Sequence, residues 1–187
     1  MQATLEEIAE HGFQHSSVTG ITKRARVSRT TFYDNFNSKT EAFAQAHIEA
    51  VSQLADILRS LSETAAPKTW RERVELGVSA YLSILEDSPQ IAYCFLVELR
   101  AAGEPLRAQT EFVMGSHARL LVKVAERALA SGEDVRVPTP AEALAVMGGT
   151  DELTAREIRT FGRGAKPKLS RLVEPITQLP SAILLPE

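Results

Sequence analysis

Apolar residues recur at intervals of three and four along most of the 187-residue chain, and this spacing predicts α-helices. Three short helical patterns follow one another near the amino end with almost no linker. Ser17, Ser28 and Ser38 stand where N-caps are expected, and Gly12 stands where a first helix would end. Hairpin signals, tandem repeats and low-complexity tracts are absent from the pattern. We therefore predict an all-α fold of about nine helices.

Beyond residue 43 the apolar pattern predicts a body of longer helices. A fourth helix would end near residue 66, and the later ones are expected over 68–87, 88–103, 104–131, 139–162 and 168–185. Leu120 and Leu129 fall at core spacing within 104–131. Pro175 and Pro180 are expected to kink or restart the last helix, because proline lacks an N–H. We divide the chain into a head at 1–45 and a body at 46–187.

Between residues 17 and 36, helical spacing places a group of apolar side chains on the inward face and leaves a group of polar side chains outside it. The inward positions are Val18, Ile21 and Ala25, with Val27 as a plug in the turn, and Phe32 and Phe36 one helical turn apart. Two short helices joined by a tight turn form a helix-turn-helix, whose second helix fits the major groove of DNA. The polar residues that this packing leaves over are Arg29, Thr30, Thr31, Tyr33 and Asn35.

Charge is distributed unevenly along the chain. The formal net charge is −3, yet four cations and no acidic residue lie between Glu10 and Asp34. For Lys23 and Arg24 a solvated helix face is an equally good explanation of the charge. A local basic patch on a mildly acidic protein is typical of binding at a few DNA sites rather than to any polyanion.

Composition excludes several other classes of protein. The single cysteine, Cys94, rules out an internal disulfide and fits a reducing compartment. The longest apolar run, 91–97, is too short to span a bilayer, and no leader opens the chain, so we expect a soluble, cytoplasmic protein without membrane contacts. No phosphate loop, zinc motif or nucleophile elbow occurs, and the four histidines are scattered. We expect no enzyme activity, no metal site and no cofactor.

An ordered set of positions runs through the helix-turn-helix segment: Val18, Ile21, Ala25, Val27, Ser28, Thr31, Phe32, Tyr33, Phe36, Ser38 and Lys39. It resembles the DNA-binding domain of the TetR (tetracycline repressor) family of bacterial transcription regulators. The resemblance implies a three-helix head on a helical-bundle body that binds a ligand and forms a dimer. Arg26 departs from the family, which has glycine there, and indicates a residue at positive φ. The chain also begins at Met1, so we expect no arm in the minor groove.

The resemblance implies two kinds of contact with double-stranded DNA. Phosphate contacts fall to Ser17, Thr31, Tyr33 and Lys39, which would fix the register of the protein on the duplex. Base edges would be read by Arg29, Thr30 and Asn35, with Thr19 in support. Arg26 either contacts a phosphate or is tolerated strain.

The resemblance also implies a homodimer on an inverted-repeat operator, since a two-fold dimer presents two recognition helices. The last two helices carry an apolar stripe that suits a helix–helix interface. The predicted interface residues are Leu144, Met147, Gly148, Leu169, Leu172, Val173, Ile176 and Leu179. The alternative is that this stripe packs only within its own subunit.

A regulator of this family would be released from DNA by an unidentified small molecule bound in the body. Repression is the common mode of regulation in the family, so we expect a repressor. The predicted ligand residues are Tyr81, Tyr93, Phe95, Glu98, Phe112, Met114 and His117. Their composition indicates a mostly apolar or aromatic ligand. Ordinary core packing is the alternative for the aromatic and methionine residues. A helical ligand-binding or protein-interaction module whose shortened head no longer binds DNA is the alternative function.

Overall fold

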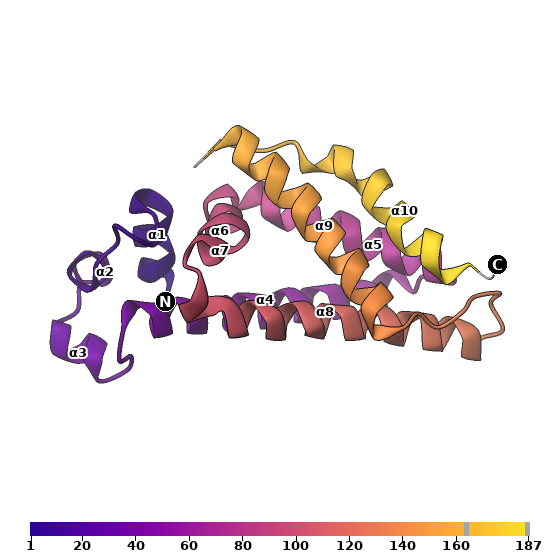
Figure 1. Cartoon of the computed structure of the whole chain (residues 1–187), viewed down its shortest axis with the longest axis horizontal. Coiled ribbons are helices and arrows are strands. Elements are labelled where there is room, and N and C mark those ends of the chain that lie inside the picture. Colours follow the sequence, from indigo (N-terminus) through magenta and orange to yellow (C-terminus); the bar gives the residue numbers. More distant parts are fainter. Residues whose placement is uncertain (163–164, 186–187) are drawn as a thin grey trace.

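A computed structural model of the chain describes residues 1–162 and 165–185, and every regular element in this part is helical. Three short helices form the head: α1 (Gln2–His11), α2 (Val18–Ala25) and α3 (Arg29–Tyr33). They gather at one end of an elongated molecule, with α3 at the outer tip (Figure 1). The predicted all-α fold is confirmed.

The body is built on long helices. Its elements are α4 (Lys39–Ala65), α5 (Trp70–Asp87), α6 (Pro89–Tyr93), η1 (Cys94–Glu98), α7 (Leu99–Ala101), α8 (Glu104–Ala130), α9 (Pro140–Phe161), η2 (Leu169–Leu172) and α10 (Val173–Leu184). Helix α4 starts in the head and continues along the body beside α8, while α9 crosses them and packs on α8 and α10 (Figure 1). One helix therefore belongs to both parts of the molecule.

Serine hydroxyls begin the helices of the head as the sequence predicts. The hydroxyl of Ser17 accepts a hydrogen bond of 3.0 Å from the Gly20 N–H, and the hydroxyl of Ser28 accepts one of 3.0 Å from Thr31. Ser38 caps α4 in the same way, accepting from the Glu41 N–H at 3.1 Å. Each cap satisfies one of the N–H groups that a helix start leaves without a partner. The boundaries of α2, α3 and α4 follow from these contacts.

The head and the body share buried apolar residues. Phe13, which follows α1, stacks on Phe43 of α4 with ring centroids 5.7 Å apart. The same cluster contains Ile8 from α1 and reaches Leu99 and Leu106 in the body. A smaller cluster inside the head holds α2 against α3 and the start of α4; its buried members are Ile21, Phe32 and Ala42. Burial of these side chains is the main force that positions α3.

Two residues expected inside the head lie at its surface. Val27, predicted to plug the turn between the helices, is 41% exposed, and Ala25 is exposed as well. The space between α2 and α3 is filled instead by Ile21 and Phe32. The turn is closed by the backbone, because the Val27 N–H donates to the Thr22 carbonyl at 3.1 Å. These two predictions were wrong.

The body differs from the prediction at three points. Leu120 and Leu129 of α8 were expected in the core, but each is 51% exposed. They lie on opposite sides of α8, and Leu120 borders a cavity of the body. Pro180 does not break α10, which continues through it to Leu184, and Pro175 falls in the first turn, where no intrahelical N–H is needed.

The predicted helix over 88–103 is divided into three pieces. Pro89 opens α6 at the first helical position as expected, but the segment then passes through the π-helical turn η1 before α7. In this turn the Leu99 N–H donates to the Cys94 carbonyl, five residues back. The η1 turn packs between α1 of the head and α9 of the body. Such turns occur frequently at functional sites, and this one lies at the junction of the two parts.

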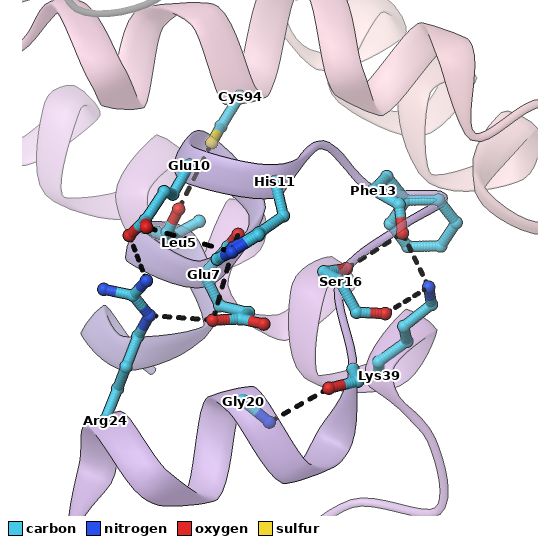
Figure 2. A network of polar contacts seen from close by, with 11 residues as sticks. Leu5, Glu7, Glu10, His11, Phe13, Ser16, Gly20, Arg24, Lys39 and Cys94 are labelled. Atoms are coloured by element: carbon cyan, nitrogen blue, oxygen red, sulfur yellow. Dashed lines mark hydrogen bonds and ion pairs between the residues drawn. The ribbon is translucent and has the colours of Figure 1, made fainter.

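A buried carboxylate joins α1 to α2. The Glu7 side chain lies against Gly20 and accepts a hydrogen bond of 2.8 Å from Arg24 Nε (Figure 2). A Cβ at position 20 would lie 1.9 Å from Glu7 Oε1, so the absence of a side chain there makes room for the carboxylate. The other arm of Arg24 pairs with Glu10.

We expect Gly20→Ala to destabilise the chain by roughly 1–3 kcal/mol, because the new methyl group would force the Glu7 carboxylate off Arg24. Urea unfolding measures the change. The matched control is Gly77→Ala in α5, where an added Cβ meets no atom within 4 Å. It should be neutral or stabilise by up to about 1 kcal/mol through helix propensity. Equal losses in the two variants would contradict the role of Glu7.

Candidate DNA-binding surface and effector cavity

The predicted DNA contacts lie on one exposed part of the head. Of the nine residues, eight are exposed, and Lys39 is partly buried. Tyr33 is 48% exposed, although its ring edge touches Phe32 in the core of the head. The exposed residues are Ser17, Thr19, Arg26, Arg29, Thr30, Thr31, Tyr33 and Asn35. The structure therefore gathers cations, hydroxyls and one phenol around α3.

Contacts within α3 restrict its polar side chains. The Arg29 guanidinium carbon lies 5.9 Å from the centre of the Tyr33 ring, within the range of a cation–π interaction. The Asn35 side-chain amide donates to the Thr31 carbonyl at 2.8 Å. The hydroxyls of Ser28 and Thr31 lie 2.9 Å apart and share a hydrogen bond. These side chains are ordered before any partner binds, which lowers the entropy that binding must remove.

Arg26 has the backbone conformation expected at its position. Its φ is 54° and its ψ is 41°, which is the left-handed region that glycine adopts most easily. A residue with a side chain costs on the order of 1 kcal/mol there. The Arg26 N–H donates to the Lys23 carbonyl at 3.3 Å and so ends α2. Its side chain is exposed beside the turn.

Two cations of the head have partners inside the protein. The Lys39 ammonium donates to the backbone carbonyls of Phe13 at 2.6 Å and Ser16 at 2.9 Å (Figure 2). It also donates to the Gln14 carbonyl at 3.3 Å. Partial burial lowers the pKa of this ammonium. Arg24 pairs with the carboxylates of α1. Lys39 thus clamps the loop between α1 and α2, and its assignment as a phosphate contact stays a prediction.

The body holds an apolar cavity made of two chambers that share part of their walls. The chamber near the head has a volume of 120 Å³ and is lined mainly by α4, α5 and α8, with Phe95 and Leu96 from η1. The far chamber has a volume of 180 Å³ and lies between the second half of α4, α5, α8, α9 and α10. Leu54, Tyr81, Met114, His117 and Asp151 line both chambers. We call these five residues the waist of the cavity.

Four of the seven predicted ligand residues line this cavity: Tyr81, Phe95, Met114 and His117. The other three predicted residues do not line it. Phe112 is 65% exposed on the outer face of α8, and Tyr93 packs among apolar residues of α5 and α9. Glu98 accepts a hydrogen bond from the head and does not line the cavity.

Sequence reasoning missed three polar residues of the cavity. His47, Arg100 and Asp151 line the head-side chamber, yet they come from three different helices. The Asp151 carboxylate accepts from Arg100 at 2.9 Å, and Arg100 also binds Glu152 at 3.0 Å. A charge at position 151 in a helix of mostly apolar and small residues was the one available signal. The spacing along the chain does not reveal that these side chains meet.

Burial controls the charge of the cavity. It raises the pKa of the Tyr81 hydroxyl and of the Asp151 carboxyl, against the opposing effect of Arg100. Burial lowers the pKa of the His47 imidazole to about 4, with a further contribution from His117. The pKa of His117 is lowered for the same reason. Both histidines are therefore neutral near pH 7, and the Arg100–Asp151 pair carries no net charge.

The η1 turn connects the cavity to the head. Phe95 and Leu96 from this turn line the head-side chamber. On the opposite side of the same turn, the buried Glu98 carboxylate accepts a hydrogen bond of 2.8 Å from the Phe13 N–H. The Cys94 thiol donates to the Leu5 carbonyl of α1 at 3.4 Å (Figure 2). One short segment therefore contacts both the cavity and the helix that supports α2.

The predicted dimer residues are not equally available to a partner. Leu169 and Ile176 are fully buried within their own subunit, so these two assignments were wrong. They pack against α5 and α9, as the alternative interpretation of the stripe allowed. Leu144 is 46% exposed. The remaining predicted residues are partly exposed: Met147, Gly148, Leu172, Val173 and Leu179.

Within 1–162 and 165–185, no three side chains of His, Cys, Asp or Glu come together in a way that could hold a metal ion. None of the helices in the same ranges combines the length and the apolar character needed to cross a membrane.

Comparison with known proteins agrees with this geometry. Residues 1–46 match the model of the bacterial regulatory proteins of the tetR family. The chain is 26% identical to the fatty acid metabolism regulator protein of Bacillus subtilis (strain 168) over 133 residues, which are 71% of this chain and 68% of that protein.

Solved structures share the whole fold. The fatty acid degradation regulator FadR from Bacillus halodurans superposes with a TM-score of 0.81 at 24% identity, over 96% of this chain and 91% of that one. The regulator FadR from Bacillus subtilis in complex with stearoyl-CoA gives a TM-score of 0.78 at 23% identity, over 97% and 96% of the two chains.

A helical head with an exposed helix-turn-helix, joined to a body with an enclosed apolar cavity, defines a ligand-responsive transcriptional regulator. Its first 46 residues match the model of the tetR family of these regulators, as the helix-turn-helix residues implied. The proteins that it matches are regulators, which confirms that it is not an enzyme.

The low pKa of His47 makes stability depend on pH. The folded chain holds this imidazole at a pKa of about 4, below the ordinary value of 6.5, so the unfolded chain binds the proton more readily. The contribution is complete above pH 6.5 and is lost as the pH falls toward 4. We expect wild type to lose roughly 2 kcal/mol from this group between pH 7 and pH 5.

Urea unfolding of wild type and His47→Leu at the two pH values measures this contribution. The variant should lose less stability than wild type over the same interval. The difference between the two proteins isolates His47 from Asp151, whose raised pKa acts in the opposite sense. Replacement of the exposed His15 by Gln serves as the control and should retain the wild-type dependence. Identical pH dependence in His47→Leu and wild type would contradict burial of a neutral imidazole.

Proposed function

We propose that the chain is a cytoplasmic homodimeric repressor that binds an inverted-repeat operator and is released by a long-chain acyl-CoA. The observation that carries the proposal is the exposed polar surface of α3 on a head whose α1 and α4 share an apolar core with the segment that lines a cavity. Each part of the proposal has its own support.

The residues of α3 divide by position into two kinds of DNA contact. Arg29 and Thr30 stand at the amino end of the helix, where side chains can reach base edges in the major groove. Tyr33 lies one turn further on, and its hydroxyl suits a phosphate oxygen. The capped start of α2 at Ser17 adds backbone N–H groups that favour an anion. Thr19, Asn35 and the partly buried Lys39 complete the proposed surface.

Arg29→Ala should relax the base preference at one position in each half-site by roughly 1–3 kcal/mol, because one bidentate contact to guanine would be lost. Gel shifts on the DNA that flanks the gene, with single base-pair substitutions, measure the preference. The control is Lys23→Ala, an exposed cation of α2 outside the proposed base-reading set. It should leave all preferences unchanged. An unaltered preference pattern in Arg29→Ala would remove Arg29 from the base-reading residues.

An unpartnered face of α9 supports the homodimer. Its first half exposes Ala141, Leu144 and Ala145, and Gly148 on the same helix is partly exposed. A Cβ placed on Gly148 meets no atom within 4 Å, so another helix could approach closely there. Helix α10 packs beside α9 and adds the partly exposed Leu172 and Leu179. We infer that a second copy covers this face, with two-fold symmetry that places two α3 helices on one operator.

The proposed chemical class of the effector is supported by the lining of the cavity and by the proteins that the chain resembles. Both chambers are lined chiefly by aliphatic and aromatic side chains, which suits a long hydrocarbon chain. A relative regulates fatty acid metabolism, and a structure of the same fold was solved with stearoyl-CoA. We infer that an acyl chain occupies the cavity, and that the same ligand releases the operator.

The η1 turn gives the ligand a route to the DNA-binding surface. A chain that contacts Phe95 and Leu96 also presses on the turn that holds Phe13 through Glu98. A shift of this turn would move α1, and α2 and α3 would follow because α2 packs on α1 and α3 packs on α2. The ligand would then favour a head position in which the two α3 helices no longer match the half-sites.

Stearoyl-CoA should release the chain from its operator, while free coenzyme A at the same concentration should not, because the acyl chain supplies the contacts in the cavity. A gel shift over a series of ligand concentrations measures the release. Release by coenzyme A alone, or complete indifference to stearoyl-CoA, would rule out this effector class. The DNA-binding part of the proposal would be judged separately by the base preferences of the ligand-free chain.

A further inference from the structure

The waist carries polar side chains at the point where two apolar chambers meet. Tyr81, His117 and Asp151 line both chambers, and His47 lies on the head-side wall close enough to His117 for His117 to contribute to the lowered pKa of His47. A cavity built only for hydrocarbon would gain nothing from polar groups in this place. Their presence calls for a physical reason.

One polar atom on the cavity wall is buried without a partner in the part of the chain that the structure describes. His47 is 6% exposed, and its Nδ1 atom is buried without a hydrogen bond. Among the hydrogen bonds of residues 1–162 and 165–185, none engages the imidazole of His117 or the hydroxyl of Tyr81. Buried polar atoms are nearly always paired, because an unpaired one loses its hydration without replacement. An unpaired atom on a cavity wall therefore marks a place where a ligand atom completes the pairing.

The charges of the residues around the waist limit the kind of ligand group that can bind there. Asp151 is already paired with Arg100, so the pair offers neither an unbalanced cation nor an unbalanced anion. Burial lowers the pKa of both imidazoles, so they remain neutral donors or acceptors near pH 7. A charged ligand group would lose its hydration here without a counter-charge. A carbonyl or hydroxyl oxygen can use the same partners at much lower desolvation cost.

We propose that the waist binds one uncharged oxygen of an otherwise apolar effector, with His47 and His117 as the hydrogen-bonding residues that select for it. This inference rests on the proposed acyl effector and names the feature that the site selects. In an acyl-CoA two atoms could supply the oxygen: the thioester carbonyl, or a carbonyl or hydroxyl along the chain.

Isothermal titration of the full-length chain with matched probes distinguishes the two sources. The probes are stearoyl-CoA, S-octadecyl-CoA, which is a thioether without the carbonyl, and 10-oxo-octadecanoyl-CoA. If the thioester carbonyl binds, the thioether should bind about tenfold more weakly than stearoyl-CoA. If a chain oxygen binds, the oxo probe should bind about tenfold more tightly. Equal affinities for all three probes would overturn the proposal.

Variants locate the selective contact. His117→Leu should abolish the difference in affinity between probes, and His117→Gln, which keeps a donor and an acceptor, should retain most of it. The control is Phe112→Leu on the same helix, since Phe112 is 65% exposed and outside the cavity. It should retain the wild-type difference. A difference that persists in both His117→Leu and His47→Leu would also overturn the proposal.

A second measurement does not depend on acyl-CoA. Decan-5-one and decane are added to the chain labelled with ¹⁵N in its histidine rings, and the ring signals are followed by NMR. The ketone should shift the signals of His47 and His117, whereas decane should leave the ring nitrogens nearly unchanged. If the ketone moves neither signal, the waist does not bind an uncharged oxygen, whatever the operator assay shows. If stearoyl-CoA fails to release DNA but the ketone shifts both signals, only the effector class is wrong.

Discussion

A buried hydrogen bond between the Glu98 carboxylate and the Phe13 N–H holds the head to the body. Around it, apolar residues of α1 and α4 pack against the segment that follows η1. A carboxylate in such surroundings is stabilised only while its partner stays in place. The orientation of α1 and of everything that packs on it therefore depends on a segment of the body. The same segment forms part of the cavity wall, so the position of the head and the shape of the cavity cannot vary independently.

The cavity contrasts with the core of the head. In the head, the buried polar groups have partners within the chain: Glu7 binds Arg24, and the Ser16 hydroxyl donates to the Phe13 carbonyl at 2.8 Å. On the wall of the cavity, the neutral His47 imidazole has a buried Nδ1 atom that lacks such a partner. Full pairing stabilises one arrangement of a structural core. A missing hydrogen bond lowers the stability of the ligand-free protein and favours a ligand that supplies this bond.

Local features were predictable from the sequence, whereas contacts between distant helices were not. The caps at Ser17, Ser28 and Ser38 depend on neighbours three residues away, and all three were confirmed. Periodicity also located the long helices, but it could not say which of their faces would be covered. Leu129 has the spacing of a core residue and is exposed because no neighbour reaches that side of α8.

The polar residues of the cavity show the same limit more strongly. His47, Arg100 and Asp151 lie 53 and 51 positions apart, and no local pattern links them. Arg26 shows the opposite case, since a departure from the family at one position was enough to predict its positive φ. Sequence patterns were informative where the backbone itself is constrained, and less so where the fold alone decides which side chains meet.

Cys94 has a practical consequence. Its thiol is fully buried beneath α1, and the chain has no second cysteine. An alkylating reagent can reach this sulfur only when α1 lifts away from η1. The rate at which this thiol is labelled in the native protein therefore measures how often α1 separates from η1.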